Sequence, residues 1–187
     1  MPPRIKYTKE QIVNAGVELV REGGIAALNA RALAGRLGCS TQPIFREFSG
    51  MEEVKAAVIK QAEQIYNGYI QRSASKPGPN YKATGLAYID FAREEGALFQ
   101  LLFMRDRRGE VIPPRMTDDN MEYIMQTIST ATGLTGDQAY DFHLHMWIYA
   151  HGLASMVATH FADFTEEEAG RLLGEEFKAF TRRYETQ

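Results

Sequence analysis

The side chains best suited to catalysis or metal binding are four histidines and one cysteine, and their spacing argues against either chemistry. His143 and His145 lie two residues apart, and residues two apart on a helix point about 200° from each other, so they cannot bind one ion together. No Ser/His/Asp set, carboxylate pair or glycine-rich phosphate loop has the spacing that catalysis requires. Cys39 alone cannot form an internal disulfide. The residues predict no catalytic site, no metal site and no cofactor; a small helical enzyme using His143, His145 or Asp141 stays an alternative.

A different chemistry, the reading of a DNA duplex, is indicated by polar side chains that follow a glycine turn. Gly38 separates two short helical segments, and a tight turn of this kind sets two helices at a steep angle. Polar side chains at the start of the second segment can reach base edges and phosphates, while Ile44 and Phe48 face inward. The alternative is that any small three-helix cluster needs such turns. The predicted DNA-binding residues are Lys6, Thr8, Asn29, Arg31, Ser40, Thr41, Gln42, Pro43, Phe45, Arg46 and Lys55.

Local signals place four helices in the first third of the chain. The predicted starts are the capping boxes of Thr8 with Gln11 and of Ser49 with Glu52, and the N-cap residues Asn29 and Ser40. The first helix ends at Gly23 and Gly24, the second ends at Gly38, and the third runs to about Phe48. The fourth helix is predicted over residues 51–72, with one long apolar face.

The remaining sequence also has helical periodicity, with an irregular stretch from Arg105 to Arg115. Apolar residues recur three and four positions apart over 81–93, 96–104, 118–132, 137–161 and 165–184, and alternation of period two is absent. The fold class is therefore predicted to be all-α, with about nine helices. We expect a helix-turn-helix domain at 1–50 and a helical bundle at 51–187, connected by the helix at 51–72.

The charge of the chain is distributed unevenly. The net charge is −3, but residues 1–60 carry +3 and the rest carries −6. A basic head on an acidic body suits a protein that places one end on phosphates. No run of eighteen apolar residues occurs, and the N-terminus lacks the apolar stretch of a signal peptide. We therefore predict a cytoplasmic protein with no membrane partner.

These motifs resemble the TetR family of repressors over residues 8 to about 56. The run Arg31-Ala-Leu-Ala-Gly-Arg-Leu-Gly-Cys-Ser-Thr-Gln-Pro-Ile-Phe-Arg-Glu-Phe-Ser-Gly-Met-Glu-Glu-Val54 is similar to that family's second helix, turn, recognition helix and opening of the fourth helix. Trp147, His151 and Gly152 resemble the Trp-x-x-x-His-Gly signature of one group of its C-terminal domains. The resemblance implies an all-helical homodimer on a palindromic, double-stranded operator, usually released by an effector bound in the C-terminal half.

Three residues depart from the family's usual pattern in the DNA-binding half. Phe45 stands where a tyrosine often contacts a phosphate, Met51 stands where a lysine is common, and Glu47 places a carboxylate near the DNA. Each change loses or opposes a phosphate contact. Lys55 and Arg46 are expected to compensate, so we predict a binder with a smaller dependence on salt. The alternative is a helical ligand-binding protein whose DNA binding is weakened or lost.

The C-terminal half is rich in aromatic and methionine side chains at helical spacing. Most of these must form the core, but a cavity lined by them would suit a small, mostly apolar effector. The predicted ligand-binding residues are Phe91, Phe99, Phe103, Met121, Met125, His143, Trp147 and His151. The predicted dimer interface comprises Ala154, Ala158, Leu173, Phe177 and Phe180; alternatively, these faces close the core of the subunit itself.

Overall fold

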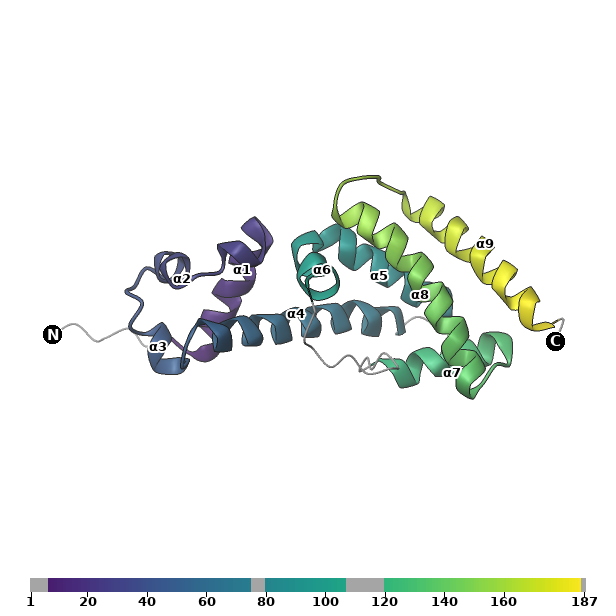
Figure 1. Ribbon diagram of the computed structural model, residues 1–187, viewed down its shortest axis with the longest axis horizontal. Helices are drawn as coiled ribbons and strands as arrows, with labels where there is room; N and C mark the ends of the chain where they lie inside the picture. The colour runs from purple at the N-terminus through teal and green to yellow at the C-terminus, as the bar shows by residue number, and fades with distance from the viewer. Residues whose placement is uncertain (1–6, 75–79, 107–119, 186–187) are drawn as a thin grey trace. The chain divides into compact units, whose positions relative to one another are not determined.

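Every regular element in the described part of the chain is a helix. The computed structural model describes residues 7–74, 80–106 and 120–185. Its helices are α1 (Lys9–Ala27), α2 (Ala30–Leu37), α3 (Ile44–Glu47), α4 (Met51–Ala74), α5 (Tyr81–Glu94), α6 (Gly96–Phe103), α7 (Met121–Thr132), α8 (Gly136–Ala158) and α9 (Glu166–Glu185) (Figure 1). The predicted all-α class with about nine helices is therefore confirmed.

The local signals with the shortest range act as predicted. The Thr8 hydroxyl accepts from the Gln11 amide at 3.2 Å, and the Gln11 side chain accepts from the Thr8 amide at 3.0 Å. The Asn29 side chain accepts from the Ala32 amide at 3.0 Å and caps α2. In α1, the dihedral angles leave the helical region at Gly23 and at Gly24, whose φ is 67°. A last turn then runs to Ala27, so the glycines interrupt α1 and do not end it.

Two predicted caps are wrong. Ser40 does not cap α3, because that helix is only four residues long and its first backbone hydrogen bonds run from Ile44 and Phe45 to the carbonyl of Thr41. Ser49 pairs with Glu53 and not with Glu52. The Glu53 carboxylate accepts from the Ser49 amide at 2.7 Å and from its hydroxyl at 2.8 Å.

Helix boundaries in the second half differ slightly from the predicted ranges. α8 ends at Ala158, three residues before the predicted 161, because His160 takes a left-handed φ of 55°. The backbone amide of Phe161 then bonds to the carbonyl of Met156, which closes the last turn. α4 runs two residues beyond the predicted 72. Residues 118 and 119 of the predicted 118–132 helix, and most of the irregular stretch 105–115, lie outside the described residues.

The chain forms two compact units. The first comprises Met1–Ile65 and Ala97–Arg105, as far as these are described, so it extends into α4 beyond residue 50. Its core is formed by Ile12, Val20, Leu33, Ile44, Val54 and Val58, all fully buried. α1 approaches α4 closely at Gly16, where a Cβ would lie 2.7 Å from Val58 Cγ2. Glycine at this position therefore permits the packing of the two helices.

The second unit comprises Tyr66–Gly96 and the described part of Asp106–Gln187. In it α5 packs against α7, α8 and α9, and α8 packs against α9 (Figure 1). Phe142 is fully buried at the centre, where its ring lies 5.3 Å from that of Phe177. Tyr81, Ile124, Ile128, Ala139 and Met146 complete the cluster around Phe142. Four helices thus converge on one aromatic core.

Candidate functional site

A left-handed glycine joins α2 to α3 in the first unit. Gly38 has φ 66° and ψ 32°, a conformation that costs an L side chain about 1–2 kcal/mol. Its amide bonds to the carbonyls of Ala34 and Gly35, and the Cys39 amide bonds to that of Ala34 at 2.9 Å. The chain therefore reverses sharply after Leu37, and α3 begins only a few residues later. This is the helix-turn-helix arrangement that the spacing predicted.

The short helix α3 has one buried side and one exposed side. Ile44 is fully buried and Phe48 is 4% exposed, as expected for the inward positions. Gln42 and Arg46 are exposed, and Phe45 exposes 47% of its surface. Thr41 and Pro43 are half-buried beside them. The outward side therefore offers amide, guanidinium and aromatic groups, which are the groups that contact base edges and backbone in a major groove.

The other predicted DNA-binding residues differ in exposure and in whether their polar groups already bond within the chain. Arg31 and Ser40 are exposed, and Thr8 is exposed while its oxygen caps α1. Asn29 also donates to the carbonyl of Ala27 at 3.2 Å, so both its amide nitrogen and its amide oxygen already bond to the backbone. Lys55 forms an ion pair with Glu52 at 2.8 Å. Lys6 lies outside the described residues.

Additional contacts fix the surroundings of this face. The Tyr7 hydroxyl donates to the carbonyl of Leu37, at the end of α2. The Lys9 ammonium lies 5.0 Å from the centre of the Phe48 ring and 3.3 Å from a carboxylate oxygen of Glu53. The hydrogen bonds from Ser49 and the Lys9 charge together hold the pKa of Glu53 below its ordinary value. Sequence reasoning missed these partners, because they lie far apart in the chain and neither spacing nor residue type predicts such contacts.

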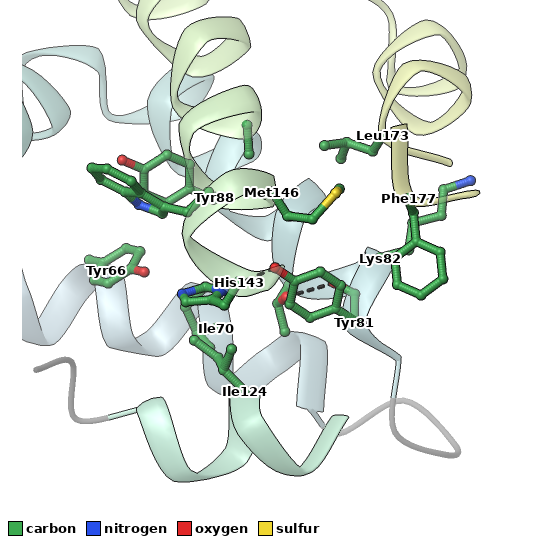
Figure 2. A pocket seen from close by; sticks show the side chains of 14 residues that line it. Tyr66, Ile70, Tyr81, Lys82, Tyr88, Ile124, His143, Met146, Leu173 and Phe177 are labelled. Atoms are coloured by element: carbon green, nitrogen blue, oxygen red, sulfur yellow. Dashed lines mark hydrogen bonds between the residues drawn. The ribbon is translucent and has the colours of Figure 1, made fainter. Parts of the chain in front are cut away.

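The second unit contains a mostly apolar cavity of about 50 Å³ (Figure 2). Side chains of α4, α5, α7, α8 and α9 form its wall, and six of the fourteen lining residues carry an aromatic ring. The lining residues are Tyr66, Ile70, Tyr81, Lys82, Thr84, Gly85, Tyr88, Ile124, His143, Met146, Trp147, Ala150, Leu173 and Phe177.

Two tyrosine–histidine hydrogen bonds tie α5 to α8 at this cavity. Tyr81 Oη lies 2.9 Å from His143 Nδ1, and Tyr88 Oη lies 2.9 Å from His151 Nδ1. Figure 2 shows Tyr81 and His143 pointing toward one another. Burial raises the pKa of Tyr81 above its ordinary value and lowers the pKa of His151 below 6.5. Both effects favour neutral groups inside the unit.

The structure brings only some of the predicted ligand-binding residues together. His143 and Trp147 line the cavity, and His151 stacks on Trp147 with ring centroids 5.0 Å apart without lining it. Phe91 is fully buried beside Tyr66, at 5.5 Å between centroids. The residues placed elsewhere are Met121, half-buried in α7, Met125, packed against the core, and Phe99 and Phe103, paired with each other in the first unit.

The predicted dimer-interface residues are directed into their own subunit. Ala154 is fully buried, and Ala158 and Leu173 are each 3% exposed. Phe177 lines the cavity, and Phe180 packs against the aromatic core. Ala154, Ala158 and Leu173 therefore pack within the subunit, whereas Phe177 and Phe180 are half-buried and keep some exposed surface, so the dimer interface stays a prediction. Small residues suit close packing of α8 within a bundle just as well as packing between bundles.

The remaining histidines do not form a site with other metal-binding residues. His145 Nε2 lies 3.9 Å from a carboxylate oxygen of Asp141, one helical turn away. Within the described ranges, no three His, Cys, Asp or Glu side chains converge as metal ligands would. No described helix has the length and apolarity needed to cross a bilayer.

A short exposed helix after a left-handed glycine, followed by an aromatic bundle with a cavity, is the arrangement found in one class of helix-turn-helix transcriptional regulators. The family model for the tetracyclin repressor-like C-terminal domain matches residues 81–178, more than half of the chain. The chain therefore belongs to the TetR family. Members of this family are DNA-binding regulators and not enzymes.

Individual relatives agree with this assignment. An HTH-type transcriptional regulator of Bacillus subtilis (strain 168), YobS, is 22% identical over 116 residues, which are 60% of this chain and 61% of that protein. A TetR-like transcriptional regulator from Rhodococcus sp. RHA1 superposes with a TM-score of 0.66 at 15% identity, covering 92% of this chain and 93% of that one. A TetR family member from Streptomyces coelicolor A3 gives a TM-score of 0.60 at 14% identity, covering 89% and 96%. At these identities the two structures establish similarity of fold.

Proposed function

We propose that this TetR-type regulator is a repressor that binds a palindromic operator as a dimer and is released by a small, mostly apolar effector. The observation that carries the proposal is the outward side of α3, where Gln42 and Arg46 are exposed beside Phe45. A helix of this kind reads bases with its outward side chains, while exposed arginines around it contact phosphates. Arg31 in α2 is the clearest such arginine.

The effector would act on DNA binding through α4. This helix is continuous over Met51–Ala74; Val54 and Val58 are buried in the first unit, and Tyr66 and Ile70 line the cavity of the second. A ligand that displaces Tyr66 or Ile70 thus acts on the same helix that carries Val54. A coupling free energy of about 1–3 kcal/mol would weaken operator binding roughly 5–150-fold, and operator DNA would weaken effector binding equally.

The dimer would form through the exposed side of α8, and the half-buried Phe177 and Phe180 of α9 stay candidates from the predicted interface. Ile148 is 56% exposed and Met156 is 38% exposed, and a Cβ on Gly152 would have open space around it. Large apolar side chains on an outward helix face are a usual feature of subunit interfaces. A two-fold axis is needed functionally, because two recognition helices must meet major grooves about 34–36 Å apart.

The experiment begins with selection of bound sequences from a random pool of DNA duplexes, followed by fluorescence anisotropy on the selected duplex. Gln42→Ala and Arg46→Ala should each weaken binding about 5–150-fold, as expected for loss of a base contact. Arg21→Ala is the matched control, because Arg21 is an exposed arginine of α1 that pairs with Glu18. Enrichment of no common sequence, or equal losses for the control, would refute the proposed reading surface.

A second candidate is a ligand-binding protein with weakened DNA binding. It is favoured by the first turn of α4, where Glu52 pairs with Lys55 and Glu53 pairs with Lys9. Both lysines, which would otherwise approach phosphates, are thus partly neutralised, and Met51 adds no charge. This candidate predicts effector binding without any sequence-selective binding of DNA. Anisotropy at low salt with the selected duplex and with an unrelated duplex separates the two, because contacts to phosphates alone bind both duplexes equally.

A further inference from the structure

The cavity of the second unit has a cation in its described lining and no carboxylate. Lys82 belongs to the first turn of α5, and its Cε and Nζ both lie 3.3 Å from the position that a Cβ on Gly170 would occupy. Nζ also lies 4.0 Å from the corresponding position on Gly174. The two glycines of α9 therefore leave room for the lysine stem, and the ammonium remains exposed at the cavity edge.

Most of the other polar groups around the cavity are already paired. Tyr81 bonds to His143, and the Thr84 hydroxyl donates to the carbonyl of Tyr81 at 2.6 Å. In contrast, the Lys82 ammonium and the Trp147 indole N–H make no hydrogen bond or ion pair with any described residue. Both groups are donors only. An incoming ligand is therefore offered a cation and an N–H donor around an apolar space.

The geometry points to an apolar anion, specifically a hydrophobic carboxylic acid, as the effector class of this cavity; the inference rests on the proposed function. The apolar body of the ligand would lie among the rings of Tyr66, Tyr88 and Phe177, and its carboxylate would pair with Lys82. A cationic ligand would meet Lys82 with no carboxylate to balance its own charge. Figure 2 shows Lys82 beside Phe177 and Tyr81, at one end of the labelled residues.

The size of the cavity limits the first probes to small acids. Its volume of about 50 Å³ is far below the roughly 300–1,000 Å³ of pockets for drug-sized ligands. It is also below the roughly 150 Å³ of a cavity that binds benzene, so even a small acid must widen it. Suitable pairs are 3-phenylpropionate with 3-phenylpropanamide and octanoate with octanamide, since each pair differs only in the charged end. Trp147 is the single tryptophan of the chain and lines the cavity, so its fluorescence reports binding directly.

The test is a fluorescence titration of the full-length protein with both pairs. The acid should bind about 3–10-fold more tightly than its amide, which is the range for a charge pair that is partly exposed to solvent. Lys82→Met should abolish this preference, and Lys82→Arg should keep it. Lys178→Met is the matched control, because Lys178 is an exposed lysine of α9 outside the lining and its loss should change nothing.

Each other outcome overturns the inference. Equal binding of acid and amide, an acid preference that survives in Lys82→Met, or no fluorescence response to any acid would exclude a carboxylate ligand at Lys82. Anisotropy with the selected duplex and no probe present tests the proposed regulator independently. Duplex binding without acid binding would support the proposed regulator and refute the proposed effector class. Acid binding without duplex binding would support the effector class and refute the proposed regulator.

Discussion

The turn between α2 and α3 permits a quantitative test, because two glycines three residues apart are held in different conformations. Gly38 has φ 66°, whereas Gly35 lies inside α2, and a Cβ at either position would meet no atom within 4 Å. Substitution by alanine therefore changes backbone energetics without steric clash. Gly38→Ala forces an L residue into the left-handed region, at about 1–2 kcal/mol, and recovers about 0.4–1 kcal/mol from the unfolded chain. The net expected loss is about 1 kcal/mol.

Gly35→Ala should have the opposite sign. Alanine in a helix interior is favoured over glycine by about 0.8–1.0 kcal/mol, so the two variants should differ by about 2 kcal/mol. Gly38→Asn should fall between them, because asparagine tolerates the left-handed region better than alanine does. Urea unfolding followed by far-ultraviolet circular dichroism gives the free energy of unfolding of each variant. Equal stability of the two alanine variants would refute the assignment of the strained turn to Gly38.

Three further predictions concern other parts of the molecule. Phe45→Tyr should tighten operator binding about 2–10-fold in anisotropy, because a hydroxyl on this exposed ring can reach a phosphate; unchanged or weaker binding would contradict the placement of the ring. Burial lowers the pKa of His151 below 6.5, so the unfolded chain takes up a proton that the folded chain excludes, and stability should fall as pH drops below about 6.5. His151→Gln should flatten that part of the stability–pH curve, and an unchanged slope would assign it to other groups. Ile148→Glu should shift sedimentation toward the monomer, whereas Ile25→Glu, at another exposed isoleucine, should not; a dimer that persists would place the interface elsewhere.

The fold was predictable from the sequence wherever the signal was local. The caps at Thr8 and Asn29 and the glycine turn at Gly38 each depend on residues within four positions, and each forms as expected. The errors arose where two neighbouring residues compete for one role. Glu52 and Glu53 both follow Ser49, and the geometry of the first turn selects Glu53. Sequence alone does not distinguish the two carboxylates.

The cavity was less predictable because its lining depends on how helices face each other. His143 and Trp147 were identified from their stripe on α8, but the tyrosines opposite them on α4 and α5 were not. Periodicity shows that Tyr81 and Tyr88 share a face of their helix, and it does not show which helix that face meets. For the same reason periodicity does not show whether the small residues of α8 pack within the subunit or between subunits.

The two tyrosine–histidine pairs bear on which helix around the cavity a ligand can displace. Tyr81 and Tyr88 lie seven residues apart on α5, and His143 and His151 lie eight apart on α8, so both spacings are close to two helical turns and both bonds form at 2.9 Å. Separating α5 from α8 would leave buried polar groups unpaired, at about 1–3 kcal/mol for each. The contacts of α4 with α5 include the edge of the Tyr66 ring against Tyr88, at 6.0 Å between centroids, and an exposed hydrogen bond from the Tyr69 hydroxyl to Glu94 at 2.6 Å. Water can replace an exposed partner, so separating α4 from α5 should cost less. We therefore expect a ligand that enlarges the cavity to displace α4, the helix that also contributes Val54 and Val58 to the core of the first unit.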